Sequence, residues 1–132
     1  MLKAYGVAAA ALAVLAFAGQ ATAQDAEAGK KVFIKCAVCH GVGDVKKPLG
    51  PTLNGVIGRT AGTEPEFLAK SAGYSNAMKE AGAAGLVWDE ANIDEYITDP
   101  KKKIPGNKMA FAGLKVEKDR LDVIAYIKTF SN

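Results

Sequence analysis

The stretch that decides the fold is Cys36-Ala37-Val38-Cys39-His40. Two thiols three positions apart share one helical turn, so both can reach one face of a planar ligand. A Cys-x-x-Cys-His run is typical of a c-type haem, which is attached through two thioether bonds. We therefore predict that Cys36 and Cys39 hold one haem covalently, and that His40 is an axial ligand of its iron.

Two other kinds of site use a similar pair of cysteines. A thioredoxin-like redox pair belongs to an α/β chain with a parallel sheet, and this sequence has no run of β-branched strands. A structural zinc ion takes four Cys or His ligands, whereas the chain has only Cys36, Cys39 and His40. Zinc would therefore need help from carboxylates, and haem is favoured over both alternatives.

The second axial ligand is expected in the segment 104–109, which ends in Met109. Haem iron bound by histidine can take methionine as its other ligand, an arrangement that raises the reduction potential. Once Met1 is lost, only Met78 and Met109 remain. Met78 lies on a predicted helix, where methionine more often fills a core. We predict that Met109, in an extended Pro-Gly loop, binds the iron and that Met78 is a core residue near the haem.

The first 23 residues have the pattern of a secretory signal peptide: an early lysine, an apolar run over 8–18, and the small-x-small site Ala21-Thr22-Ala23. The apolar run is shorter than the ~20 residues that a membrane anchor needs. We expect cleavage after Ala23, export to the periplasm and no stable membrane insertion afterwards. The remaining residues, 24–132, are expected to form one domain.

The net charge does not favour a nucleic-acid partner, but the distribution of lysines indicates a surface that steers the approach of a protein partner. The formal net charge is +3, or +2 without Lys3, which is too small for a nucleic-acid-binding surface. Acidic residues gather in 89–99 and 117–122. Lysines concentrate in the two segments that carry the predicted ligands, and we predict that these form a docking ring: Lys35, Lys46, Lys47, Lys101, Lys102, Lys103, Lys108 and Lys115.

Apolar spacing and capping residues predict an all-α fold with two irregular loops, 41–62 and 101–115. The expected helical segments are 25–38, 66–70, 75–81, 89–98 and 117–130. Ser75 is expected to cap the third, Gly82 and Gly85 to end it, and Asp99-Pro100 to stop the fourth. Gly29 in mid-helix favours a close helix crossing, because a missing side chain lets two backbones approach.

Over nearly all of residues 25–130 the chain resembles class I c-type cytochromes, closest to bacterial cytochrome c2 and similar to mitochondrial cytochrome c. The motifs that carry the resemblance follow the Cys-x-x-Cys-His run in order: Gly50-Pro51-Thr52-Leu53-Asn54-Gly55, Gly58-Arg59, Tyr74-Ser75, Gly85-Leu86-Val87-Trp88, and Pro105-Gly106-Asn107-Lys108-Met109-Ala110-Phe111-Ala112-Gly113. The resemblance implies the cytochrome c fold, with helices and long loops wrapped around one haem.

The resemblance also implies roles for single residues. The carbonyl of Pro51 is expected to accept the second ring N–H of His40. Tyr96 is expected near the methionine sulfur, and Phe33 and Tyr126 at the crossing of the first and last helices. A buried haem propionate is expected to be held by Arg59, Tyr74 and Trp88, with Asn107 in place of the usual threonine as a further donor.

This sequence departs from the family pattern in two further places. The segment between Arg59 and Tyr74 is longer than in the mitochondrial proteins, so residues 64–70 are expected to form an extra surface turn. Met78 stands where an asparagine usually joins the hydrogen-bond network beside the haem.

An iron with two protein ligands has no open position, so the expected function is one-electron transfer and not catalysis. By resemblance, a monomeric carrier of this type moves electrons from a membrane cytochrome bc complex to a terminal oxidase or a photosynthetic reaction centre. One alternative is a dedicated electron acceptor of a periplasmic dehydrogenase. Another is a haem peroxidase or ligand sensor in which Met109 is displaced, although no second histidine is present to assist such chemistry.

Overall fold

The computed structural model describes residues 24–132, so the predicted signal peptide and its cleavage site lie outside the described residues. The helical elements are α1 (Ala26–Val32), η1 (Phe33–Lys35), α2 (Pro65–Leu68), α3 (Asn76–Ala83), α4 (Glu90–Thr98), α5 (Pro100–Lys103) and α6 (Glu117–Lys128). Within these residues the backbone forms no strand, and Thr60 and Val87 make an isolated bridge. The all-α prediction is confirmed.

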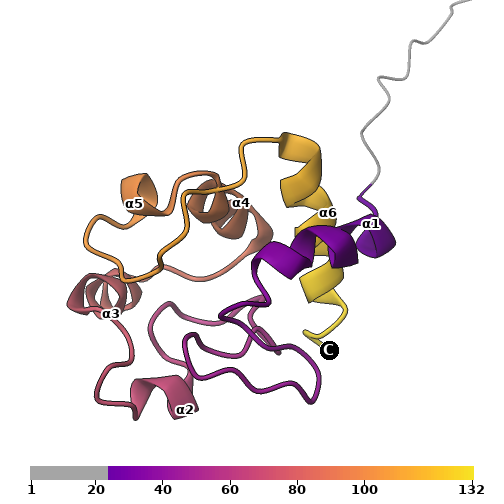
Figure 1. The fold of residues 1–132 in the computed structure, drawn as a ribbon. Coiled ribbons are helices and arrows are strands. Elements are labelled where there is room, and N and C mark those ends of the chain that lie inside the picture. The colour runs from indigo at the N-terminus through magenta and orange to yellow at the C-terminus, as the bar shows by residue number, and fades with distance from the viewer. Residues whose placement is uncertain (1–23) are drawn as a thin grey trace, which may run out of the picture.

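The first and last helices cross at Gly29, and Figure 1 shows α1 lying across α6. A Cβ atom at Gly29 would overlap the backbone carbonyl of Asp122 on α6. Beside this point the rings of Phe33 and Tyr126 pack with their centroids 5.2 Å apart. The predicted close crossing is therefore confirmed, and it fixes the turn that carries the two cysteines against the C-terminal helix.

Asp122 lies on α6 and is almost fully buried. Its side chain connects α6 to the start of α1 by a hydrogen bond. Its carboxylate accepts the backbone N–H of Asp25 at 3.0 Å and an N–H of Lys118 at 2.7 Å. The hydrogen bond from Lys118 holds the pKa of Asp122 below its ordinary value of 3.8. Because folding lowers this pKa, the carboxylate stabilises the fold above pH 3.8, and the contribution is lost as pH falls through the folded value.

Asp122→Asn is accordingly expected to lower the free energy of unfolding by about 1 kcal/mol at neutral pH, because it removes a charge that two donors share. The difference from the wild type should shrink below about pH 4, where the native carboxylate also becomes neutral. Urea unfolding of both holoproteins at neutral and acidic pH measures this. A difference that stays constant over that range would contradict the assignment.

Helix ends follow the capping pattern in most places. Asp25, Ser75 and Asp89 each accept backbone N–H groups of the helix that follows, as the sequence predicts for Ser75. The prediction that Gly82 ends its helix is wrong, because α3 continues to Ala83. A Cβ at Gly82 would overlap the carbonyl of Ala61, so this glycine permits close packing instead.

Two further helix predictions need correction. The first helix was expected to run over 25–38, but α1 ends at Val32 and only the 3-10 turn η1 follows. The prediction of a continuous loop from Lys101 is also wrong, because Pro100 occupies the first turn of α5. Proline fits a first helical turn, where its missing N–H is not needed, and Asp99 caps that turn through the N–H of Lys102.

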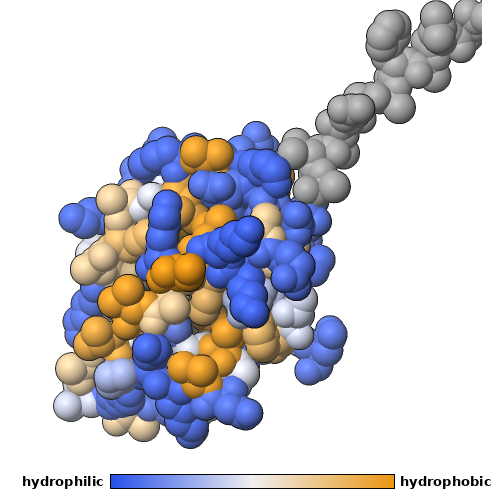
Figure 2. Space-filling view, turned by 45° about the vertical axis from the view of Figure 1, so that its right-hand side comes forward, coloured by the Kyte–Doolittle hydropathy of each residue, from blue (hydrophilic) through white to orange (hydrophobic). Residues whose placement is uncertain are grey.

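The core lies where α1, α4 and α6 meet the loops. Its buried side chains include Phe33, Val56, Trp88, Tyr96, Leu114 and Ile124. Figure 2 shows apolar patches interrupting a hydrophilic surface on the face it presents. No helix within residues 24–132 is long and apolar enough to cross a membrane.

Candidate haem-binding site

The two cysteines lie on one turn directly after η1, where the N–H of Cys39 donates to the carbonyl of Cys36 at 3.1 Å. Backbone bonds hold this segment: the N–H of Cys36 donates to Phe33 at 2.8 Å and that of His40 donates to Cys36 at 2.9 Å. Both thiols are free and half-buried. Burial raises the pKa of Cys36 to about 11, although Lys35 acts in the opposite direction. The turn therefore presents both thiols and the imidazole of His40 together.

The His40 ring is fixed in one tautomer. Its Nδ1 lies 2.8 Å from the carbonyl oxygen of Pro51, and a carbonyl can only accept, so Nδ1 carries the hydrogen. Burial lowers the pKa of His40, while the bond to Pro51 favours the charged form. A neutral ring with its hydrogen on Nδ1 leaves Nε2 as a free lone pair. This is the nitrogen that a metal needs.

Gly50 allows the loop to press on that ring. A Cβ at this position would lie 2.8 Å from Cε1 and 2.9 Å from Nδ1 of His40. The Gly50-Pro51 pair therefore supplies both the space and the acceptor that orient the imidazole.

The side chain of Arg59 stabilises the loop that contains Pro51. Its guanidinium donates to the carbonyls of Thr52 at 2.9 Å and Asn54 at 2.6 Å. The side chain of Asn54 in turn bridges both backbone groups of Gly43, at 2.8 Å each. Burial lowers the pKa of Arg59, whose neighbours Tyr74 and Glu64 act to raise it.

The bridge between Thr60 and Val87 brings Arg59 beside Trp88. The backbone N–H of Trp88 donates to the carbonyl of Arg59 at 2.8 Å. The indole of Trp88 packs against Tyr96 with ring centroids 4.9 Å apart, and both side chains are 8% exposed. Burial raises the pKa of Tyr96 to about 12.

These aromatic side chains carry hydrogens that no group accepts within residues 24–132. The hydroxyl oxygen of Tyr74 receives the backbone N–H of Glu64 at 3.2 Å, but its own O–H has no acceptor there. The indole N–H of Trp88 and the hydroxyl of Tyr96 also make no hydrogen bond within these residues, and neither atom is enclosed by protein, so both are accessible to a bound group. Free donors beside Arg59, together with two thiols and a free Nε2, fit a haem with carboxylate side chains.

Met109 is half-buried, packs against the core and lies near His40. Asn107 organises its loop: the amide oxygen accepts the N–H of Met109 at 2.9 Å, and the amide nitrogen donates to Pro100 and Ile104. Both amide hydrogens are therefore used. The expectation that Asn107 donates toward a propionate does not agree with this geometry, because Asn107 shapes the methionine loop instead.

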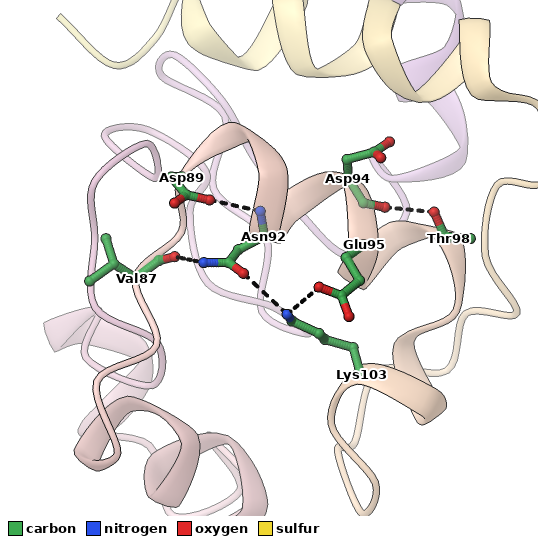
Figure 3. A network of polar contacts seen from close by, with 7 residues as sticks. All are labelled: Val87, Asp89, Asn92, Asp94, Glu95, Thr98 and Lys103. Atoms are coloured by element: carbon green, nitrogen blue, oxygen red, sulfur yellow. Dashed lines mark hydrogen bonds and ion pairs between the residues drawn. The ribbon is translucent and has the colours of Figure 1, made fainter.

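The predicted docking lysines divide into two groups. Six are exposed and make no side-chain hydrogen bond within the described residues: Lys35, Lys46, Lys47, Lys101, Lys102 and Lys108. Lys103 differs, since its ammonium donates to Glu95 and to Asn92 of α4, as Figure 3 shows. Lys115 donates to the carbonyls of Thr98 and Ala112. Lys103 and Lys115 thus have hydrogen-bond partners within the protein, and the docking ring stays a prediction.

Two polar residues were missed at the level of sequence. Asn92 bridges Lys103 and the carbonyl of Val87, so it joins α5 to the residue before Trp88 (Figure 3). Glu64 is only 7% exposed, although an acidic residue in a presumed surface turn is usually solvated. An acid directly before a proline is a helix-start signal, and that signal was available in Glu64-Pro65.

Comparisons with known proteins agree with this arrangement. A family model described as "Cytochrome c" matches residues 26–131. Cytochrome c2 of Rhodoblastus acidophilus is 50% identical over 109 residues, which are 82% of this chain and 94% of that protein. Cytochrome c of Euglena viridis is 46% identical over 109 residues, 82% of this chain and 99% of that protein. The solved structure of cytochrome c2 from Rhodospirillum centenum has a TM-score of 0.71 and 41% identity, covering 82% of this chain and 99% of the other.

Proposed function

This chain belongs to the cytochrome c family, and we propose that it is a monomeric periplasmic carrier between a membrane cytochrome bc complex and a terminal oxidase or photosynthetic reaction centre. Members of the family transfer electrons and are not enzymes, and they carry a covalent haem c. The observation that carries the proposal is the bond from His40 Nδ1 to Pro51. It leaves a free Nε2 beside two free thiols, as a haem iron ligand requires.

The residues divide the work of holding the haem. Cys36 and Cys39 would form the thioether bonds, and His40 and Met109 would bind the iron. When bound, the haem supplies a one-electron ferric–ferrous couple. Because both iron ligands would be protein side chains, ligation would be the same in the two states and little rearrangement would be needed.

Residues around the haem bind its propionate and orient its iron ligands. Tyr74, Trp88 and Arg59 present donors to a propionate, since a buried carboxylate needs paired hydrogen bonds. Tyr96 lies next to Trp88 and is the residue we assign to the methionine side. Pro51 keeps His40 in the tautomer that binds iron.

The chain reaches the periplasm through its first 23 residues, which act as a signal peptide cleaved after Ala23. Residues 24–132 then form the single cytochrome domain. The match of the family model over 26–131 supports this division.

Docking is electrostatic and uses the six exposed lysines that make no side-chain hydrogen bond within the described residues, Lys35, Lys46, Lys47, Lys101, Lys102 and Lys108. Lys46 lies 3.6 Å from Glu66, but both side chains are at least three-quarters exposed, so water screens the pair. Small contacts steered by charge suit a carrier that must leave each partner quickly.

The second-order rate constant with the cytochrome bc complex and with the oxidase or reaction centre is therefore expected to fall about tenfold or more between low and physiological salt.

The double variant Lys101→Gln/Lys102→Gln should lower this rate constant about threefold to tenfold at low salt. Lys79→Gln, an exposed lysine on α3, is the control and should change it less than twofold. Stopped-flow spectroscopy measures all three.

A rate that does not depend on salt would overturn steered docking. Turnover with a periplasmic dehydrogenase alone would favour the dedicated acceptor. Binding of carbon monoxide or reaction with peroxide in the wild type would favour the sensor or peroxidase.

A further inference from the structure

Residues 64–70, expected as an extra surface turn, are anchored by buried groups. Glu64 is 7% exposed and Phe67 is 9% exposed. The two carboxylate oxygens of Glu64 accept the backbone N–H groups of Glu66 at 3.2 Å and Phe67 at 2.8 Å. Both oxygens are therefore held by backbone donors at the start of α2. The turn therefore carries a buried negative charge into the protein.

This segment holds Tyr74 from two sides. The backbone N–H of Glu64 donates to the Tyr74 hydroxyl oxygen at 3.2 Å. The ring of Phe67 meets the ring of Tyr74 edge-on, with centroids 4.9 Å apart and planes at 84°. Because the oxygen of Tyr74 is occupied as an acceptor, its own hydrogen must be donated elsewhere. Within residues 24–132 no acceptor receives it.

Glu64 also lines the wall beside the loop that Arg59 holds. Glu64 lines a cavity of about 190 Å³ with Thr52 and Asn54, whose carbonyls receive the Arg59 guanidinium. The charges of Glu64 and Tyr74 both act on the pKa of Arg59. The other charged residues around the cavity are Lys46, Lys47, Glu66 and Lys70, and all of them are exposed. Glu64 is thus the one buried charge of this wall of the described chain.

We propose that Glu64 is a positioning residue for the haem propionate site: its backbone N–H holds the hydroxyl of Tyr74, and its buried carboxylate supplies a negative charge near the loop that Arg59 holds. The inference rests on the proposed haem site. A buried negative charge next to the propionate donors stabilises the ferric haem, which has one more positive charge than the ferrous haem. Glu64 therefore lowers the affinity of the haem for an electron, and its neutralisation should raise that affinity.

The test compares Glu64→Gln and Glu64→Ser with Glu66→Gln in the holoprotein. Glutamine keeps the size of the side chain, and serine keeps an oxygen suited to a helix start, so at least one neutral variant should fold. Glu66→Gln removes the same charge two residues away, from a side chain that is 75% exposed. Redox titration against a one-electron dye gives the equilibrium constant for reduction of each variant.

The expected result is an increase of about threefold to tenfold for both Glu64 variants and less than about 1.5-fold for Glu66→Gln, because water screens exposed charges. Equal shifts for Glu64 and Glu66, or none for either, would overturn the inference. The wild-type spectrum separates this failure from failure of the proposed function. If the wild type has the far-red iron–sulfur band, the haem site stands whatever the Glu64 variants do.

Discussion

Gly29→Ala is expected to lower the free energy of unfolding of the holoprotein by about 3 kcal/mol, although the same change in an exposed helix is stabilising. The sign reverses because the new methyl group would overlap the carbonyl of Asp122 and come within 3.0 Å of Tyr126 Cβ. The atoms in the way are mainly backbone, so no rotamer change can make room. One of the two helices must shift.

The shift would spread to the haem turn. Phe33 packs on Tyr126 at 5.2 Å, and the N–H groups of Cys36 and Ala37 donate to the carbonyl of Phe33. A displaced α1 therefore moves the segment that carries the first thiol. We expect a reduced yield of covalent holoprotein in addition to the lower stability.

Urea unfolding followed by circular dichroism gives the stability, and absorbance of the denatured protein gives the haem yield. Lys30→Ala is the matched control, since it adds an alanine at the next, exposed position of α1 and should change stability by less than about 0.5 kcal/mol. If Gly29→Ala were as stable as the control, the crossing would be looser than the structure has it.

Gly29 also illustrates what sequence reasoning could reach. A glycine costs stability inside a helix, so its presence at the apolar face of a predicted helix needs a reason, and close packing is the reason that the structure confirms. The same argument applies to Gly82, where a Cβ would overlap the carbonyl of Ala61. A second glycine, Gly85, stands three residues later and made Gly82 look like part of a helix end.

The remaining differences come from hydrogen bonds between segments far apart in the chain. Nothing local to Lys103 distinguishes it from Lys101 or Lys102, yet only Lys103 reaches Asn92 and Glu95. Helix α5 was not predicted because Pro100 has two meanings. A proline indicates the end of the preceding helix, and it is also favourable in the first turn of the next helix. The local sequence indicates which groups a residue can offer for hydrogen bonding. Which residue it contacts depends on how distant segments of the chain pack.

Met109→Ala is expected to have the largest effect on function, because it removes one of the two proposed iron ligands. The oxidised protein should lose the far-red iron–sulfur band, and the reduced protein should bind carbon monoxide. The equilibrium constant for reduction should fall about a thousandfold or more, since axial ligands set haem potentials over a range of about 0.8 V and each factor of ten is about 59 mV. Optical spectra and redox titration measure both.

The fold around the missing ligand should persist. Asn107 holds the loop through the N–H of residue 109 and the carbonyls of Pro100 and Ile104, and none of these bonds uses the methionine side chain. Unchanged far-ultraviolet circular dichroism would confirm this. The loss of the band would then report the thioether itself and not a collapsed loop.

Met78→Leu is the control that decides between the two methionines. Met78 follows the capped first turn of α3 and packs against the core, so leucine should fill its place at a cost below about 1.5 kcal/mol and leave the spectrum unchanged. If Met78→Leu lost the far-red band and Met109→Ala kept it, the ligand assignment would be reversed. If both variants kept the band, a group other than methionine would be the second iron ligand. Fast electron transfer without a change of ligation would then depend on that group.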